Sequence, residues 1–355
     1  MSGKRMGALA LIFALLLGLC ACGAAEPQKP AETAVRTFTD SLGRTVRLPE
    51  VPDKVAVSGP AAQMVVFALC PDKLAGIAAA WDPSAAEYLD SAYYALPVLG
   101  QLYGGHSTLH PETLLGSGAQ VVIDVGEARD GLAEELDALQ EQTGIPFVHI
   151  TAALDTMGAA YRLLGVLMAM PEEAETLAAY CEEVYARGVA VAGSVEKART
   201  LYLSGDDGLH AIARGSYHAE VLDLLTCNAA VVDVPAAKGT GNEVDLEQIL
   251  SWDPEVIFFA PGGLYAAAKE DPLWQTLTAV RNGQYYEVPG APYNWMGFPP
   301  SVQRLLGMLW METILYPEAV DYDLKTEVQT YFSLFYHCEL TDAQYAELVK
   351  NSIGK

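Results

Sequence analysis

Residues 171–197, PEEAETLAAYCEEVYARGVAVAGSVEK, carry the pattern that decides the fold. The opening Pro-Glu-Glu is a strong helix start, because proline loses no needed N–H donor there and acidic side chains complement the helix dipole. Apolar side chains then recur at intervals of three and four residues from Ala174 to Tyr185. A helix that runs to Lys197 would be about 40 Å long, at about 1.5 Å per residue. Since that length exceeds one small domain, the sequence predicts a helix that crosses between two.

Short β-rich runs alternate with helical periods on both sides of this helix. A hairpin is expected at 36–48. Strands are expected at 55–57, 120–124, 146–150, 200–203, 210–213, 256–260 and 284–288, with helices at 61–69, 111–115, 131–142, 154–170, 217–225, 246–252, 273–280, 299–315, 325–336 and 341–352. Such alternation indicates parallel α/β layers. The predicted fold class is therefore α/β: an N-terminal lobe over 36–170 and a C-terminal lobe over 198–355, bridged by the single long helix.

The N-terminus predicts export from the cytoplasm. Two basic residues precede an apolar run at 8–19, which is shorter than the roughly 20 residues that span a bilayer as a helix. A basic start, a short apolar run and small residues are typical of a secretory signal. Residues 19–22, Leu-Cys-Ala-Cys, resemble a bacterial lipobox. We expect a signal peptide over 1–21, lipidation at Cys22, a flexible tether over 22–35 and an extracytoplasmic, membrane-anchored lipoprotein; secretion without lipid is the alternative.

Charge and cysteine content exclude several classes of function. The formal charge of −24 becomes −26 once the signal, with its two basic residues, is removed. Nucleic acid is therefore not an expected partner, and membrane contact is expected through the lipid anchor only. Cys70, Cys181, Cys227 and Cys338 include no CxxC pair, so neither a zinc knuckle nor a disulfide framework is indicated. The sequence leaves open whether Cys227 and Cys338 form a disulfide.

Several motifs, in order, resemble the ferric-siderophore, haem and cobalamin branch of the periplasmic binding proteins. They follow the lipobox and are DSLGRTVRLP at 40–49, VPDKV at 51–55, PETLL at 111–115 before VVID at 121–124, VDLEQILSWDPEVI at 244–257 and WMGFPPSVQRLLGMLW at 295–310. Each motif is weak alone, but their order along about residues 36–350 is fairly specific.

This resemblance implies a class III fold, in which a rigid helix joins two lobes, the ligand lies between them and hinge motion is small. It also implies a binding protein rather than an enzyme, with no cofactor, that acts as a monomer with an ABC permease and its ATPase. One glutamate per lobe would meet arginines of the permease. The matching positions are Glu112 and Glu247, although both are also first-turn helix acids that the dipole favours on its own.

Candidate ligand-binding residues lie on loops that follow strands, where α/β proteins place their ligands. They are Trp81, Tyr103, Arg129, Arg214, Tyr217, His218, Tyr293 and Trp295. The guanidinium of each arginine could donate a pair of hydrogen bonds to carboxylate or catecholate oxygens of a chelate. The aromatic rings could stack on the chelate. Two alternatives are open. The arginines could be surface residues paired with nearby carboxylates, and the aromatic rings could pack beneath loops. Trp310, at helical spacing from its apolar neighbours, is expected in the core.

The expected ligand is a metal chelate, an Fe(III)-siderophore first, with cobalamin, haem or molybdate/tungstate as alternatives on the same scaffold. A chaperone that binds zinc or manganese directly is the alternative of another class. It has little support, because the six histidines form no tract and His106 and His110 stand in a Gly- and Pro-flanked loop. His149 is expected in the core. The chain also lacks a nucleophile elbow, a phosphate loop and HExxH.

Overall fold

The computed structural model describes residues 34–102 and 108–353. The predicted signal peptide, Cys22 and Tyr103 lie outside the described residues. Within the described part, no helix is both long and apolar enough to cross a bilayer.

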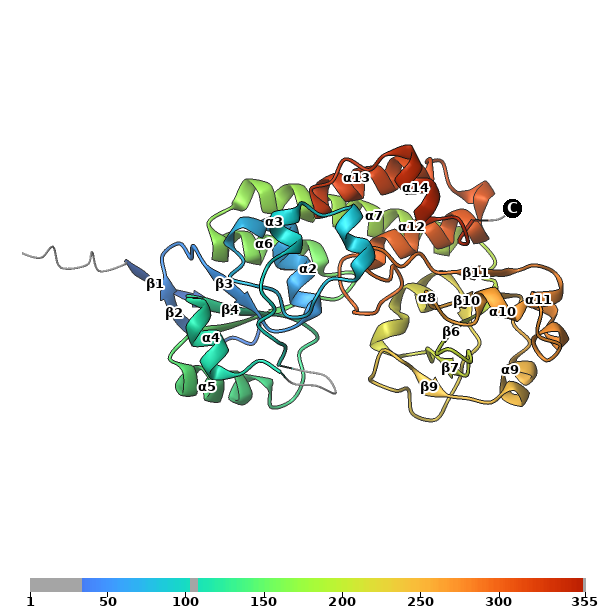
Figure 1. The fold of residues 1–355 in the computed structure, drawn as a ribbon, viewed down its shortest axis with the longest axis horizontal. Coiled ribbons are helices and arrows are strands. Elements are labelled where there is room, and N and C mark those ends of the chain that lie inside the picture. Colours follow the sequence, from blue (N-terminus) through green and yellow to red (C-terminus); the bar gives the residue numbers. More distant parts are fainter. Residues whose placement is uncertain (1–33, 103–107, 354–355) are drawn as a thin grey trace, which may run out of the picture. The chain divides into compact units, whose positions relative to one another are not determined.

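The N-terminal lobe is built on a three-stranded parallel sheet in the order β3-β4-β5 (Figure 1). Its elements are the hairpin β1 (Val35–Thr39) and β2 (Thr45–Pro49), then β3 (Val55–Val57), α2 (Pro60–Leu69), α3 (Ser91–Tyr94), α4 (Pro111–Ser117), β4 (Val121–Gly126), α5 (Leu132–Thr143), β5 (Phe147–Thr151) and α6 (Met157–Met168). Because side chains alternate along a strand, Val121 and Ile123 pack into the core shared with α2 and α6. Val122 packs on the opposite face with Leu114 of α4 and Leu136 of α5.

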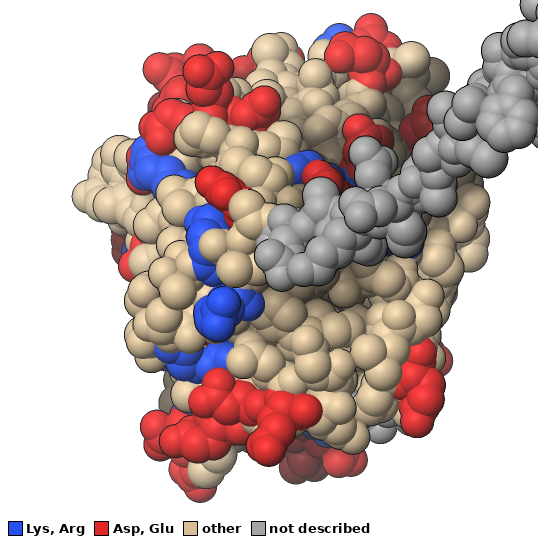
Figure 2. Space-filling model, turned by 90° about the vertical axis from the view of Figure 1, so that its left-hand side faces the viewer, with Lys and Arg blue, Asp and Glu red and all other residues tan. Residues whose placement is uncertain are grey.

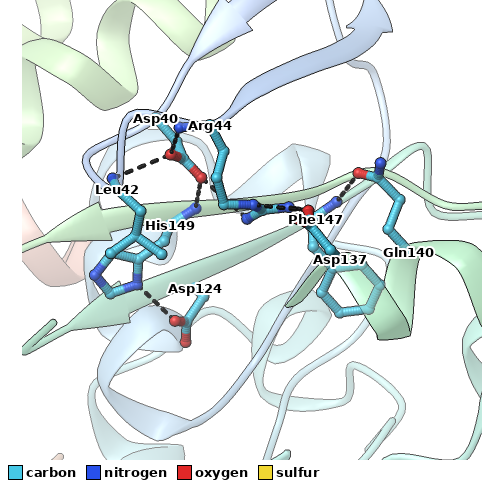
Figure 3. A network of polar contacts seen from close by, with 8 residues as sticks. All are labelled: Asp40, Leu42, Arg44, Asp124, Asp137, Gln140, Phe147 and His149. Carbon is cyan, nitrogen blue, oxygen red and sulfur yellow. Dashed lines mark hydrogen bonds and ion pairs between the residues drawn. The ribbon is translucent and has the colours of Figure 1, made fainter. Parts of the chain in front are cut away.

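Buried polar contacts tie the hairpin to this sheet (Figure 3). The Asp40 carboxylate accepts hydrogen bonds from the backbone N–H of Arg44 at 2.9 Å and of His149 at 3.2 Å. The Arg44 guanidinium spans Asp40 and Asp137 of α5. The His149 ring lies 2.7 Å from Asp124 through Nδ1 and is 1% exposed, which confirms the prediction of a core histidine.

The C-terminal lobe contains a six-stranded mixed sheet in the order β11-β10-β6-β7-β9, with β8 paired to β6. Its elements are β6 (Arg199–Ser204), β7 (His210–Ala211), α8 (Glu220–Leu225), β8 (Cys227–Asn228), β9 (Asn242–Glu243), α9 (Leu246–Trp252), β10 (Val256–Phe259), α10 (Tyr265–Ala268), α11 (Thr278–Arg281) and β11 (Tyr285–Glu287). β10 runs parallel to β6 and β11, but β7 runs antiparallel to β6 and β9. The expectation of purely parallel layers therefore holds for the centre of this sheet and not for its β7–β9 edge.

The long helix α7 (Pro171–Ser194) joins the lobes, and it ends three residues before the predicted end. It packs along α6 of the N-terminal lobe and against α8 of the C-terminal lobe. Gly188 allows a close crossing with α12 (Arg304–Leu315), because a Cβ there would lie 2.5 Å from the Met308 sulfur. The predicted fold of two α/β lobes bridged by one long helix is confirmed.

The C-terminal helices return over both lobes. α12 is followed by α13 (Leu324–Tyr336), which packs on α2 of the N-terminal lobe, and by α14 (Asp342–Leu348). Tyr331 and Phe335 of α13 stack with ring centroids 4.3 Å apart. Trp310 is fully buried, as predicted, and Thr341 and Gln344 form a capping box at the start of α14. α12 begins at Arg304 rather than 299, because residues 291–303 form an irregular segment.

Glu312 of α12 is fully buried, and this burial raises its pKa to about 7, although a hydrogen bond from the Tyr322 hydroxyl at 2.8 Å opposes the shift. The pKa of Glu312 is higher in the folded state than in the unfolded chain. The folded state is therefore penalised progressively as pH rises from about 4.5 to about 7.

The variant Glu312→Gln removes this penalty. When the pH is raised from 4.5 to 8, the free energy of unfolding of the variant is expected to increase by about 3 kcal/mol relative to that of the parent chain. Urea denaturation at both pH values measures this change, with the exposed Glu318→Gln as control. If the free energies of unfolding of the variant and the parent chain differed by the same amount at both pH values, the raised pKa of Glu312 would be contradicted.

Candidate functional site

A cavity of about 700 Å³ lies where the two lobes and α7 meet. It is lined by Glu127, Leu154 and Asp155 of the N-terminal lobe, Tyr185 of α7, and Gly215, Ser216, Tyr217, Glu220, Asp223, Leu224, Pro235, Ala236 and Ala237 of the C-terminal lobe. Its volume falls within the roughly 300–1,000 Å³ of small-molecule sites. Glu127 follows β4 directly, and Leu154 and Asp155 lie within four residues of the end of β5. This wall therefore lies at the carboxyl ends of parallel strands, as α/β folds favour.

Tyr217 links the two walls. It follows Ser216, whose hydroxyl accepts a hydrogen bond from the His218 N–H and so caps the short turn there. The Tyr217 hydroxyl donates to the Ala152 carbonyl of the N-terminal lobe at 2.6 Å. Burial raises the pKa of Tyr217, which keeps the hydroxyl protonated as a donor at neutral pH. The lobes are therefore bonded to each other at the cavity.

A buried arginine supports the C-terminal wall from behind. Arg304, at the start of α12, is fully buried and forms an ion pair with Glu220 of α8. It also donates to the Tyr217 carbonyl at 3.1 Å and lies over the Tyr217 ring, 4.9 Å from its centroid. Burial raises the pKa of Glu220, and the Arg304 charge opposes that shift. This arrangement fixes the position of two lining side chains.

Asp223 shapes the neighbouring loop. Its carboxylate accepts the Gly215 N–H at 2.7 Å and the Asn228 amide at 2.9 Å. Gly215 has φ +82°, a left-handed conformation that glycine adopts without strain. Asp223 therefore holds the loop that carries Ser216 and Tyr217 against the cavity.

Of the eight predicted ligand residues, Tyr217 alone lines this cavity within the described part of the chain. Arg129 forms an exposed ion pair with Glu135 of α5. The Arg214 guanidinium folds back onto β8, where Nε donates to the Asn228 carbonyl at 2.9 Å. Both arginines thus have intramolecular partners: Arg129 has the carboxylate partner that the sequence left open as an alternative, and Arg214 has a backbone carbonyl.

Three of the predicted aromatic residues, Trp81, Tyr293 and Trp295, pack in or against the hydrophobic core and not in the cavity lining. Trp81 is 5% exposed and lies 5.5 Å from the Tyr293 ring, centroid to centroid. The Tyr293 hydroxyl accepts a hydrogen bond from Gln63 at 2.7 Å. Trp295 is fully buried and donates to the Ala291 carbonyl at 3.2 Å. His218 is also buried, 2.7 Å from the Gly297 carbonyl through Nδ1.

The sequence interpretation missed the carboxylates of the cavity. Glu127 stands on the loop that follows the predicted strand 120–124, so the rule that selected Arg129 applies equally to it. Asp155 fell inside the predicted helix 154–170, which excluded it from the loop candidates. Tyr185 was recognised only as part of the apolar stripe of the long helix. Within the described residues, no group of three or more His, Cys, Asp and Glu side chains is arranged to hold a metal ion.

The two predicted docking residues are exposed, one in each lobe. Glu112 lies in the first turn of α4 and Glu247 in the first turn of α9. In Figure 1 both helices lie below the helical layer formed by α12, α13 and α14.

The family model described as "Periplasmic binding protein" matches residues 108–292. A search of curated proteins found no match.

Solved structures of transport proteins share the fold. An ABC transporter solute binding protein from Sulfurospirillum deleyianum is 26% identical, with 89% of this chain and 99% of that chain covered and a TM-score of 0.81. A periplasmic solute binding protein from Veillonella parvula is 25% identical over 90% of this chain and 98% of that chain, with a TM-score of 0.71. A molybdate periplasmic binding protein from Haemophilus influenzae, bound to molybdate, is 19% identical over 86% of this chain and 99% of that chain, with a TM-score of 0.68.

Proposed function

Because the chain belongs to the periplasmic binding protein family, we propose that it captures a metal chelate, an Fe(III)-siderophore first, for an ABC importer. The chelate is held between the lobes and delivered to a permease, while a separate ATPase supplies the energy. No bond is made or broken in this role, so the chain acts as a binding protein and not as an enzyme.

The observation that carries this proposal is the cavity between the lobes. It is formed by both lobes and by α7, and its volume of about 700 Å³ suits a chelate-sized guest. Tyr185 and Tyr217 offer ring faces on which a chelate can pack. Cobalamin, haem and molybdate or tungstate are the other guests considered for this scaffold, and direct zinc or manganese binding is the alternative of another class.

The lobes are expected to move little when a guest binds. Besides the Tyr217 bond, Ser301 donates to the Ala61 carbonyl of α2 at 3.0 Å and Gln63 donates to Tyr293. The Ser301–Ala61 and Gln63–Tyr293 hydrogen bonds join residues more than 200 positions apart, and together with the Tyr217 bond they resist a wide hinge opening. They support delivery by docking of a nearly rigid body.

Docking is assigned to Glu112 and Glu247, which would pair with arginines of the permease. An exposed carboxylate can accept a forked pair of hydrogen bonds from a guanidinium, which is directional and gains strength as the interface excludes water. One such residue stands on each lobe. We further propose that the chain is a monomer outside the cytoplasm, held at the membrane by lipid on Cys22.

Native mass spectrometry of the chain, expressed with its own N-terminus and purified in mild detergent, tests this function. We expect one metal chelate per chain and a mass that starts at lipidated Cys22. Calorimetry with a ferric trihydroxamate, cyanocobalamin, haemin, molybdate and Zn²⁺ then identifies the class of guest. If the purified chain carried no guest and none of these compounds bound, capture of a metal chelate would be excluded.

A further inference from the structure

The interlobe cavity has a strongly one-sided charge, and we propose that it selects guests with a net positive charge. The cargo would be a cationic metal chelate, such as a ferric trihydroxamate that carries a free ammonium group. This inference rests on the proposed capture function and narrows its substrate class.

Carboxylates stand on both walls of the cavity. Glu127 and Asp155 of the N-terminal lobe are exposed, and neither forms an ion pair with another described residue. Glu220 and Asp223 face them from the C-terminal lobe. None of the 13 lining residues, all of them in the described part of the chain, is a lysine or an arginine.

The three arginines described above have partners within the chain. Arg304 lies behind the wall and is paired with Glu220, so it offsets one of the four carboxylates and leaves the lining net negative. Arg129 and Arg214 have the partners described above. On the face of the N-terminal lobe in Figure 2, Lys and Arg form a band between two acidic edges. The band does not contribute to the lining, and the whole chain carries −24.

A concave site with walls of one sign concentrates the field and attracts guests of the opposite sign. The same walls oppose anions, because a like charge brought between them finds no basic partner in the lining. Molybdate, tungstate, tricatecholate complexes and haem with its two propionates are therefore disfavoured. The remaining lining, with Leu154, Leu224 and the Pro235–Ala237 run, contacts the apolar part of a chelate.

One chelate in three charge states tests the inference. A linear ferric trihydroxamate is used with its terminal amine free, acetylated or succinylated. The net charge of the chelate then changes from positive to neutral to negative, while the coordination of the iron stays the same. Calorimetry on the full chain is expected to show at least about tenfold tighter binding of the free amine than of the acetylated form. The succinylated form is expected to bind weakest, and the preference should shrink as salt is raised.

Neutral variants of the wall locate the effect. Glu127→Gln with Asp155→Asn is expected to remove most of the preference for the free amine while the acetylated form binds as before. Glu196→Gln with Glu318→Gln removes two exposed carboxylates outside the lining and should leave the preference intact. Thermal unfolding checks that both double variants are folded.

The outcomes separate the two claims. Equal affinity for the three charge forms, or binding of molybdate or haemin in their place, would overturn the charge inference and leave the capture role standing. The charge inference would also fail if the preference survived in the Glu127→Gln/Asp155→Asn variant. If none of the compounds bound, the proposed function itself would be contradicted.

Discussion

The variant Arg304→Met is expected to lower the free energy of unfolding by about 3 kcal/mol. Arg304 is fully buried, and its guanidinium pairs with Glu220 while donating to the carbonyls of Tyr217 and Ser301. Methionine fills a similar volume but leaves Glu220 without its counter-charge and the Tyr217 carbonyl without its side-chain donor, while the Ser301 carbonyl keeps the backbone N–H of residue 304. Breaking one side of a buried pair costs more than the pair contributes, because the remaining charge stays desolvated.

Arg162→Met is the matched control, since Arg162 forms ion pairs with Glu175 and Glu182 on the surface. Surface pairs of this kind contribute little because water and salt screen them. Urea denaturation of both variants at pH 7 measures the difference. If the two variants lost the same stability, the structural role given to Arg304 would be incorrect. Because Arg304 holds Tyr217 and Glu220, its replacement should also weaken binding of the cationic trihydroxamate.

The double variant Glu112→Ala/Glu247→Ala is expected to bind its chelate with unchanged affinity and to reduce transport at least about tenfold, which corresponds to the loss of about 1.4 kcal/mol of interface energy. Both side chains are exposed and lie outside the cavity lining. Their removal therefore leaves the cavity lining intact, while the permease arginines that we propose as their partners would lose them. Uptake of the radiolabelled chelate by cells, together with calorimetry on the purified chain, measures the two effects separately.

Glu134→Ala/Glu172→Ala is the control for docking. These residues are also exposed acids in first helical turns, of α5 and α7, so the control removes the same charge and the same helix-dipole interactions. Transport should be unaffected. Loss of transport in both double variants would show that net charge, not docking at two defined positions, is what matters.

The fold could be predicted to a large extent because its signals are local. The start of α7 is encoded by Pro171, and the apolar stripe that follows identifies its buried face. The C-terminal end of α7 was harder to predict, because Val195 adopts an extended conformation there and neither Val195 nor the residue after it is a glycine or a proline. The antiparallel edge at β7 could not be foreseen, because two-residue strands have no periodicity to detect.

The site was harder to predict for a related reason. Strand-end rules identify the loops that carry ligands, but they do not say which side chain of a loop faces the cavity. Arg129 and Glu127 stand on the same loop, yet Arg129 turns to Glu135 while Glu127 lines the cavity. The burial of Trp81 against Tyr293 joins residues more than 200 positions apart, a contact that a single sequence does not encode locally.

Filling the cavity tests most directly whether it is the binding site. Ala237 is exposed on the cavity wall, and Ala237→Trp would place an indole where the guest is proposed to lie. Ala266→Trp, on exposed α10 and outside the lining, is the control. Calorimetry with the cationic ferric trihydroxamate, on variants whose thermal unfolding matches that of the parent chain, is expected to show at least about a tenfold loss of affinity for Ala237→Trp and none for Ala266→Trp. Equal affinity in the two variants would contradict the assignment of the cavity as the binding site.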